Sequence, residues 1–252
     1  MYVDVHCHLL PGVDDGVRDW EESRACLRMA VEEKVSTVLL TPHIWPGKYP
    51  NSPEALRTAF QEWRARAAAA GVESHLGAEV YFSRDLAERW RRGELLPMGD
   101  AGRYLLVELP LLLMPQGVAQ ALFDLRLLGV EPVLAHPERY PYVADKLSLL
   151  EPIAAAAVPF QLTTHSVAGL FGSRIQKAAL AILEAGWAAA LASDAHGPVQ
   201  RAPMFREAVR LVANRYGKEA ARRLCIENPR RLLEGRDLLP VRCVPPRRRR
   251  RP

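Results

Sequence analysis

Short apolar runs alternate with longer amphipathic stretches along the chain up to about residue 200. Runs such as 35–41 (VSTVLLT) and 130–136 (VEPVLAH) have the length and β-branched content of buried strands. This pattern predicts seven strands, over residues 2–7, 35–41, 74–80, 103–109, 130–136, 158–163 and 187–193.

The stretches between these runs have helical spacing and carry signals for helix ends. Ser52 and Pro53 are typical of an N-cap and a first helical residue, and Gly71, Gly129 and Gly186 are typical of helix C-termini just before a strand. The predicted helices cover residues 20–34, 53–70, 83–92, 117–128, 144–157, 173–186, 202–214, 217–225 and 228–234.

Repeated strand–helix–strand order indicates parallel strands joined by helical crossovers, hence an α/β fold. Near-continuous apolar strands indicate a sheet that is covered on both faces or closed into a barrel. We therefore expect a TIM-like barrel with seven strands.

The amino-acid composition indicates which class of protein this is. The 252 residues are 49% apolar and 25% charged, as in an ordinary globular domain, and one domain over residues 1–240 is the simplest expectation. The net charge of +5 comes from five arginines at 247–251, since the rest has 29 basic and 29 acidic residues. A neutral body argues against nucleic-acid binding. Residues 241–252 are predicted to be a disordered Pro/Arg-rich tail, whose charge suits an anionic partner.

The cysteines and apolar runs indicate the compartment. Four scattered cysteines without a CxxC pair indicate a reduced protein with neither disulfides nor a cysteine zinc site. The N-terminus does not have the pattern of a signal peptide, and the apolar run 111–114 is too short to cross a bilayer. We expect a cytoplasmic protein without a membrane span.

Histidines and carboxylates fall at the carboxyl ends of the predicted strands, which meet at one face of a parallel α/β barrel. His and carboxylate ligands without thiolates suit manganese, iron or zinc. His6 and His8, two apart on a strand, point to the same side, and Glu79 or Glu108 could bridge two cations around a phosphoryl group. The pattern predicts a metal centre for hydrolysis at phosphorus, built from His6, His8, His43, Glu79, Glu108, His136, Asp194 and His196.

Each residue alone has a simpler interpretation. A buried histidine is usually a hydrogen-bonded core residue, Asp194 could cap a helix, and Glu108 could be a paired structural carboxylate. Several unpaired ionisable groups buried together would cost several kcal/mol each, which favours metal ions. His75 is expected to be structural. His165 is left open between the rim of the site and an outer-shell role.

Two arginines lie next to the candidate ligands. A planar guanidinium suits the oxygens of a phosphate, so Arg139 and Arg201 are candidates for phosphate binding. The alternatives are an ion pair between Arg139 and Glu138 and a solvated helix start at Arg201.

The ordered set of motifs resembles the PHP-superfamily bacterial protein-tyrosine phosphatases, manganese-dependent enzymes of capsule and exopolysaccharide loci. The similarity covers roughly residues 1 to 235. It rests on HCHLLPGVDDG at 6–16, TPH at 41–43, GAE at 77–79, VELP at 107–110, LAHPERY at 134–140, QLTTHSVAGLFG at 161–172 and SDAH at 193–196.

The resemblance implies a distorted (β/α)7 TIM-like barrel (PHP fold) that holds three divalent ions, manganese first, with iron or zinc as alternatives. It adds Asp15 to the ligands; Asp15 adjoins Gly16 in the motif, and Asp14 remains an alternative. It makes Arg139 and Arg201 the catalytic and substrate-binding arginines, and it implies a tyrosine-phosphorylated protein, a bacterial tyrosine kinase, as substrate. The implied ligands are His6, His8, Asp15, His43, Glu79, Glu108, His136, Asp194 and His196.

The predicted reaction is attack on phosphorus by a metal-activated water. Cys7 could suggest a thiol nucleophile, but strand alternation points it away from His6 and His8, and no CxxxxxR loop surrounds it. Three alternatives keep the same cluster: a small-molecule phosphatase of the histidinol-phosphate type, a phosphodiesterase, and a non-catalytic scaffold stabilised by metal.

Overall fold

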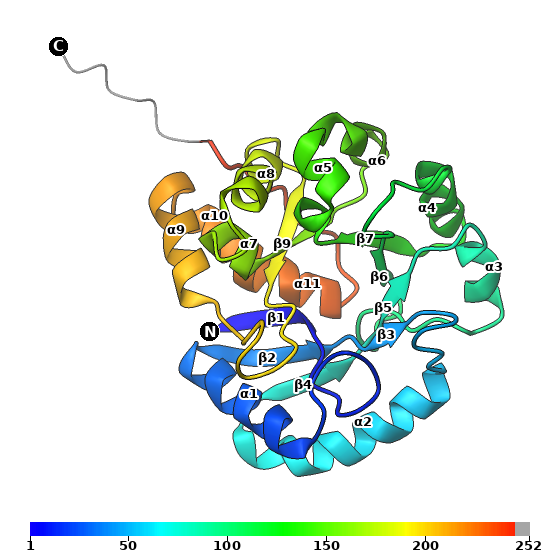
Figure 1. The fold of residues 1–252 in the computed structure, drawn as a ribbon, viewed down its shortest axis with the longest axis vertical. Helices are drawn as coiled ribbons and strands as arrows, with labels where there is room; N and C mark the ends of the chain where they lie inside the picture. Colours follow the sequence, from blue (N-terminus) through cyan, green and yellow to red (C-terminus); the bar gives the residue numbers. More distant parts are fainter. Residues whose placement is uncertain (245–252) are drawn as a thin grey trace.

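The computed structural model describes residues 1–244, and the arginines at 247–251 lie outside the described residues. Parallel strands occupy the centre of the molecule, with helices arranged around them (Figure 1). One sheet has the strand order β1-β2-β4 and the other has β3-β5-β6-β7-β8-β9. The strands are β1 (Tyr2–Cys7), β2 (Val35–Leu40), β3 (His43–Ile44), β4 (Glu73–Leu76), β5 (Glu79–Tyr81), β6 (Tyr104–Glu108), β7 (Glu131–Ala135), β8 (Phe160–Thr163) and β9 (Ala188–Ala192).

The two sheets are connected where chain segments pass from one to the other. β2 leads into β3 across Thr41 and Pro42, and β4 leads into β5 across Gly77 and Ala78. On the far side, the backbone N–H of Asp194 donates to His6 (2.8 Å) and that of His8 donates to Ala195 (2.8 Å). Backbone hydrogen bonds therefore also join the segment after β9 to the end of β1.

The helices lie between and outside the strands. The longer ones are α1 (Trp20–Glu32), α2 (Pro53–Ala67), α4 (Val118–Arg126), α8 (Ser173–Glu184) and α9 (Arg206–Tyr216). The short ones are α3 (Leu86–Arg91), α5 (Pro141–Asp145), α6 (Glu151–Ala155), α7 (Thr164–Ala168), α10 (Lys218–Arg222) and α11 (Asn228–Leu233), with the tighter or wider turns η1 (Ala68–Ala70), η2 (Pro137–Arg139), η3 (Leu147–Leu150) and η4 (Arg223–Glu227).

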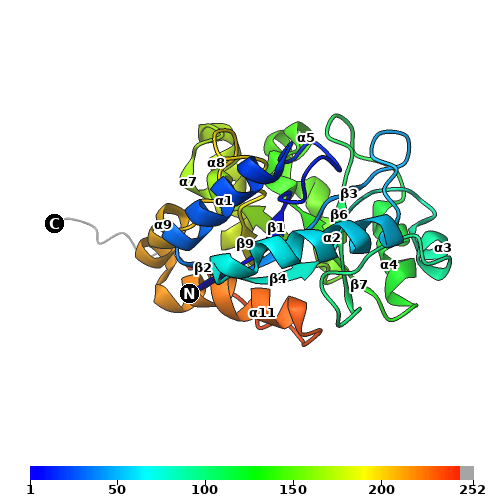
Figure 2. The same ribbon diagram turned by 90° about the horizontal axis from the view of Figure 1, so that it is seen from below.

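Both faces of the strands are buried, as their apolar sequences predict. In β6, Leu105 and Val107 belong to a large core cluster with the surrounding helices. The alternate residues Tyr104 and Leu106 belong to a second cluster that includes Leu232 of α11. Figure 2 shows α11 below the strands. Successive residues of one strand thus pack alternately into two different hydrophobic clusters.

Two predicted elements are wrong in detail. Residues 74–80 do not form one strand, because Gly77 interrupts it; a Cβ there would lie 2.9 Å from the Pro97 carbonyl oxygen. Residues 144–157 do not form one helix, because Pro152 has no N–H to donate to the preceding turn, and α6 starts anew beside it. The short strand β3 and helices α5 and α7 were not predicted.

The N-cap predicted for α2 is present: the Ser52 side chain accepts from the N–H of Ala55 (3.2 Å). At the C-terminal end, Val241 and Cys243 are buried, so packed residues continue beyond 240. The four cysteines are free and buried. Among the described residues, no helix combines the length and the apolar character needed to cross a bilayer.

Candidate metal centre

Most candidate ligands lie at or just after the carboxyl end of a strand, whereas His43 and Glu79 begin the short strands β3 and β5 that follow β2 and β4. His6 lies near the end of β1 and His8 just after it, Glu79 begins β5, and Glu108 ends β6. The strand ends thus collect side chains from positions 6 to 196 of the chain. All nine are buried except Asp15, whose side chain is 41% exposed, and Glu108, at 16%.

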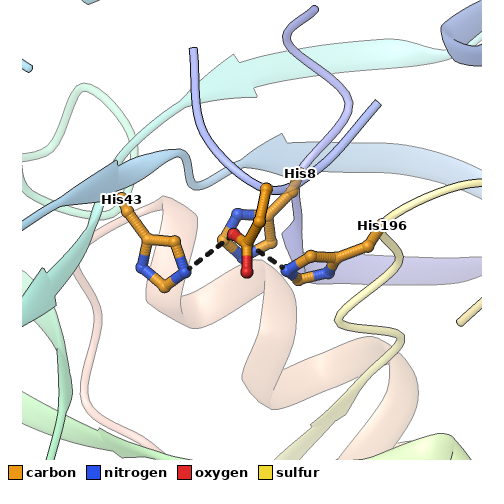
Figure 3. Close-up of side chains that lie close together, drawn as sticks. His8, His43 and His196 are labelled. Carbon is orange, nitrogen blue, oxygen red and sulfur yellow. Dashed lines mark ion pairs between the residues drawn. The ribbon is translucent and has the colours of Figure 1, made fainter. Parts of the chain in front are cut away.

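The ligand atoms form three groups, within each of which they lie no more than 4.8 Å apart. His43 belongs to two groups and Glu79 to two, so the groups adjoin one another. Figure 3 shows the first group, where His43 and His196 approach one carboxylate, that of Asp15, from either side at 3.3 and 3.6 Å. The groups are His8, Asp15, His43 and His196; His6, Glu79, His136 and Asp194; and His43, Glu79 and Glu108.

Outer hydrogen bonds fix the ring protons of the first two histidines. The Nδ1 of His6 lies 2.8 Å from the Gln161 Oε1, and the amide nitrogen of Gln161 donates to the Leu162 carbonyl oxygen (2.8 Å). The Nδ1 of His8 lies 2.7 Å from an oxygen of Asp14. These contacts place a proton on the Nδ1 of each ring, and the two Nε2 atoms lie 3.1 Å apart. A cation between or beside the rings would be coordinated by both Nε2 atoms.

The remaining donor atoms fit the same interpretation. Among the described residues, His43 Nδ1, Glu108 Oε2, His136 Nδ1 and Asp194 Oδ1 are buried without a hydrogen-bond partner. Unpaired buried polar atoms are rare in folded proteins, because each costs free energy that a partner would recover. Imidazole and carboxylate donors are those of borderline divalent ions, so the residues present fit a metal centre.

Asp14 and Asp15 occupy different positions. Asp14 accepts hydrogen bonds from the His8 ring, the Gly16 N–H (2.9 Å) and the His43 N–H (2.9 Å), which engage both of its oxygens. Asp15 instead lies against the ring nitrogens of His43 and His196. The structure therefore places Asp15 within the cluster and Asp14 behind it.

The carboxylates and imidazoles of the cluster shift one another's pKa values. Burial acts to raise the pKa of Glu79, yet the imidazoles of His6 and His43 hold it well below its ordinary value. Burial and the charges of Glu79 and Asp194 raise the pKa of Glu108 well above its usual range. Added cations would favour the ionised form of both carboxylates.

The pKa values of the histidines in the cluster also shift in opposite directions. Burial acts to lower the pKa of His8, but the charge of Asp14 holds it well above its ordinary value. Burial and the positive charge of Arg139 lower the pKa of His136 to about 4, and burial together with His8 lowers that of His196 to about 4. The neutral form, which binds metals, is thus favoured at His136 and His196.

Arg139 and Arg201 converge on Asp194. Both guanidinium groups donate to the same oxygen of Asp194, that of Arg201 at 2.9 Å. Their side chains are 22% and 23% exposed, so they border the centre and remain accessible. The alternative pairing of Arg139 with Glu138 is wrong, because Glu138 is fully buried and accepts from the N–H (2.8 Å) and hydroxyl (3.0 Å) of Thr163.

The other singled-out residues lie at the edge of the site or away from it. His165 is buried in α7 and stacks on Phe171, 5.4 Å between ring centroids, while the guanidinium of Arg139 covers the same Phe171 ring. Burial raises the pKa of the Cys7 thiol well above its ordinary value, which disfavours a thiolate. His75 pairs with Glu73 on β4, apart from the three groups.

Sequence reasoning missed two buried polar residues that support the cluster. Asp4 accepts from the N–H (2.9 Å) and hydroxyl of Ser193, the residue before Asp194. Gln161 orients His6. A signal existed in both cases, because each is a polar residue inside an apolar strand, where an unpaired polar side chain is costly.

Comparisons with known proteins agree with this geometry. A family profile described as capsular polysaccharide synthesis, CpsB/CapC, matches residues 2–234. The chain is 32% identical to the tyrosine-protein phosphatase YwqE of Bacillus subtilis (strain 168), covering 98% of this chain and 97% of YwqE. It is 28% identical to the tyrosine-protein phosphatase CpsB of Streptococcus pneumoniae, covering 92% and 98%.

A solved structure gives the same relationship in three dimensions. It belongs to the crystal structures of YwqE from Bacillus subtilis and CpsB from Streptococcus pneumoniae, which are described as unique metal-dependent tyrosine phosphatases. The TM-score is 0.90 at 32% identity, over 96% of this chain and 99% of the other. The similarity therefore extends over nearly the whole of both chains.

Proposed function

The chain belongs to the CpsB/CapC family of capsular polysaccharide synthesis, and from this premise we propose that it is a metal-dependent phosphomonoester hydrolase that removes phosphate from tyrosine side chains of a protein. The observation that carries the proposal is the junction of three His/carboxylate groups with two arginines that converge on Asp194. One place thus offers ligands for cations and donors for the oxygens of a phosphate.

The proposal also includes the closure of the strands into a barrel. We infer that the strands close into a distorted (β/α)7 barrel of the PHP type, in one phosphatase domain that extends past the expected boundary at 240 to the buried Cys243. The hydrogen bonds between the end of β1 and the segment after β9 support closure, as does the passage of β2 and β4 into β3 and β5. In such a barrel every ligand would face one mouth.

The metal sites take the nine predicted ligands: His6, His8, Asp15, His43, Glu79, Glu108, His136, Asp194 and His196. Three divalent ions would match the three groups, and we propose manganese first, with iron or zinc as alternatives. When bound, such ions supply Lewis acidity, which polarises a phosphoryl group and makes water nucleophilic near neutral pH.

The side chains of the protein would supply position and charge. Arg139 and Arg201 can move their hydrogen bonds from Asp194 to the equatorial oxygens of the phosphate and stabilise the negative charge that develops there. Gln161 and Asp14 hold His6 and His8 with their Nε2 atoms toward the centre. A phenolate is a good leaving group, so a strong general acid is not required.

The physiological substrate that we propose is a phosphotyrosine segment of a bacterial tyrosine kinase, by analogy with relatives named tyrosine-protein phosphatases. A cytoplasmic location remains a prediction, which the four free cysteines favour.

The test compares substrates and variants on purified, manganese-loaded protein. We expect hydrolysis of a phosphotyrosine peptide to exceed that of a phosphoserine peptide, histidinol phosphate and single-stranded DNA. His136→Ala should lower kcat/KM by about a hundredfold or more, since removal of a ligand should cost at least as much as loss of an outer-shell partner.

Cys7→Ser, at the end of β1 between His6 and His8, serves as the control, and its activity should stay close to that of the wild type. A trapped phosphocysteine, or full activity in His136→Ala, would contradict the proposed function. Faster hydrolysis of histidinol phosphate or DNA would contradict the proposed phosphotyrosine substrate. It would leave the proposed metal centre in place. Metal binding without hydrolysis of any substrate would indicate the scaffold alternative.

A further inference from the structure

A short turn next to the metal centre presents a lysine on aromatic rings. Trp45 and Tyr49 pair across the turn, with the Trp45 N–H donating to Tyr49 (2.9 Å) and the Tyr49 N–H donating to Trp45 (2.8 Å). Gly47 occupies the turn with a φ of 85°, a conformation that suits glycine. Asn51 fixes the base of the turn by donating to the carbonyl oxygens of His43 (2.8 Å) and Val13 (3.0 Å).

Trp45, Tyr49 and Tyr81 form an aromatic platform at this turn. The rings of Trp45 and Tyr81 stack with centroids 3.9 Å apart and planes 6° apart, and Tyr49 meets Trp45 edge-on at 6.2 Å. All three side chains are only partly buried, so their rings remain available at the surface. The catalytic scheme above uses none of these three residues.

The aromatic platform is continuous with the metal centre. The ring of Tyr49 stacks on that of His43, with centroids 5.4 Å apart and planes 8° apart. Tyr81 lies in register with Glu108 and two residues beyond Glu79 on β5, so it points to the same side of the strand as Glu79. The aromatic platform therefore adjoins the metal centre on the side of His43 and Glu79.

Lys48 places a positive charge on the platform. Its ammonium nitrogen lies 4.4 Å from the Trp45 ring centroid and 4.8 Å from that of Tyr49. Lys48 is exposed, and within residues 1–244 no carboxylate lies within 4 Å of it. Cation–π contacts with two rings restrict the motion of the Lys48 ammonium group. Binding of an anion there therefore costs less side-chain entropy.

We propose that Lys48, held on the aromatic platform, binds the carboxylate of an acidic residue next to the phosphotyrosine of the substrate. The inference rests on the proposed function and adds a sequence preference to it. The ring planes of the platform would contact the peptide backbone and apolar groups, while Lys48 selects acidic neighbours and disfavours basic ones.

The test uses three phosphotyrosine peptides that differ only at the positions next to the phosphotyrosine, which carry Glu, Ala or Lys. For the wild type we expect kcat/KM to be roughly threefold to tenfold higher for the Glu peptide than for the Ala peptide, with the Lys peptide lowest. Lys48→Glu should reverse this order. Hydrolysis of p-nitrophenyl phosphate, which has no flanking residues, should change less than about twofold.

Lys218→Glu in α10 makes the same charge change away from the turn and should leave the order of the peptides unchanged. Equal kcat/KM for the three peptides in the wild type, or an equal loss on all substrates in Lys48→Glu, would overturn the inference.

Binding of the same peptides carrying a non-hydrolysable phosphonate, measured by fluorescence anisotropy, separates this inference from the proposed function. Binding that depends on the flanking residues without any hydrolysis would sustain the inference and count against the phosphatase activity. Binding that is equal for all three phosphonate peptides would overturn the inference, whatever the enzyme hydrolyses.

Discussion

At the scale of residues, the centre depends on close approaches that only particular side chains allow. A Cβ on Gly16 would lie 2.2 Å from the His8 carbonyl oxygen and 2.5 Å from the His8 Cβ. Gly16 also donates its N–H to Asp14, which holds His8 and His43. The glycine after the two aspartates therefore lets this loop press against the first strand and orient two histidines.

Gly16→Ala should push the loop away from His8 and misplace Asp14. We expect the manganese concentration that gives half-maximal activity to rise about tenfold to a hundredfold, as for loss of an outer-shell partner. Gly197→Ala is the control on another loop at the same mouth, because the nearest atom to its Cβ would be 3.8 Å away. Equal effects of the two substitutions, in a metal titration of activity, would contradict this role.

Backbone conformation gives a second sign of function at this scale. Three of the five non-glycine residues with positive φ in residues 1–244 are His136, Asp194 and Arg201. Such conformations cost free energy and persist where the surrounding structure enforces them, often at active sites. The sequence predicted these residues from their chemical type, but it could not predict their backbone angles, which depend on contacts made after folding.

At the scale of elements, the carboxylate of Glu33 joins the end of α1 to the start of α9. It accepts from the N–H groups of Phe205 and Arg206 at 2.8 Å each, where α9 has no cap of its own. Burial acts to raise the pKa of Glu33, but these N–H donors and the Arg206 guanidinium hold it below its ordinary value. A long-range capping residue of this kind has no local sequence signal.

Glu33→Ala should lower the free energy of unfolding by about 1 kcal/mol near neutral pH. Because the pKa is lower in the folded state, this stabilisation is full above the unfolded pKa and is lost as the pH falls through the folded pKa. Thermal unfolding of the wild type and Glu33→Ala should therefore converge in acid. Glu32→Ala, at an exposed neighbouring position, is the control. A difference that grows in acid would exclude the capping role.

The elements that the sequence predicted well are those with strong apolar periodicity, such as β1, β2, β6 and β9. Those that it missed depend on distant contacts. β3 has two residues and exists because it pairs with β5, and β4 and β5 separate where Gly77 packs against the Pro97 segment. Local pattern alone cannot predict such breaks, although they set the positions of His43 and Glu79.

At the scale of the whole molecule, the centre links folding to metal binding. Buried imidazoles and carboxylates from many segments meet at one site, and ions would remove the repulsion among Glu79, Glu108 and Asp194. The sequence predicted which residues meet because the order of strands and helices restricts the topology. It did not predict the outer hydrogen bonds from Asp4 and Gln161, which need atomic positions.

Removal of metal should therefore destabilise the protein. With manganese in excess, we expect the melting temperature to exceed that in a chelator by about 5 °C or more. Asp14 holds the pKa of His8 above its ordinary value, so the ring keeps an extra proton as the pH falls and binds metal less well. The difference in melting temperature should shrink from about pH 8 to about pH 6. A melting temperature that does not respond to metal at either pH would contradict this coupling.

The most direct test of the account is anomalous diffraction from crystals of the manganese-loaded protein. We predict three anomalous peaks, one within coordination distance of each His/carboxylate group, with Arg139 and Arg201 beside them. Peaks elsewhere in the molecule, or none at these groups in crystals of active enzyme, would contradict the claim that residues from separate strand ends form one metal-binding catalytic centre.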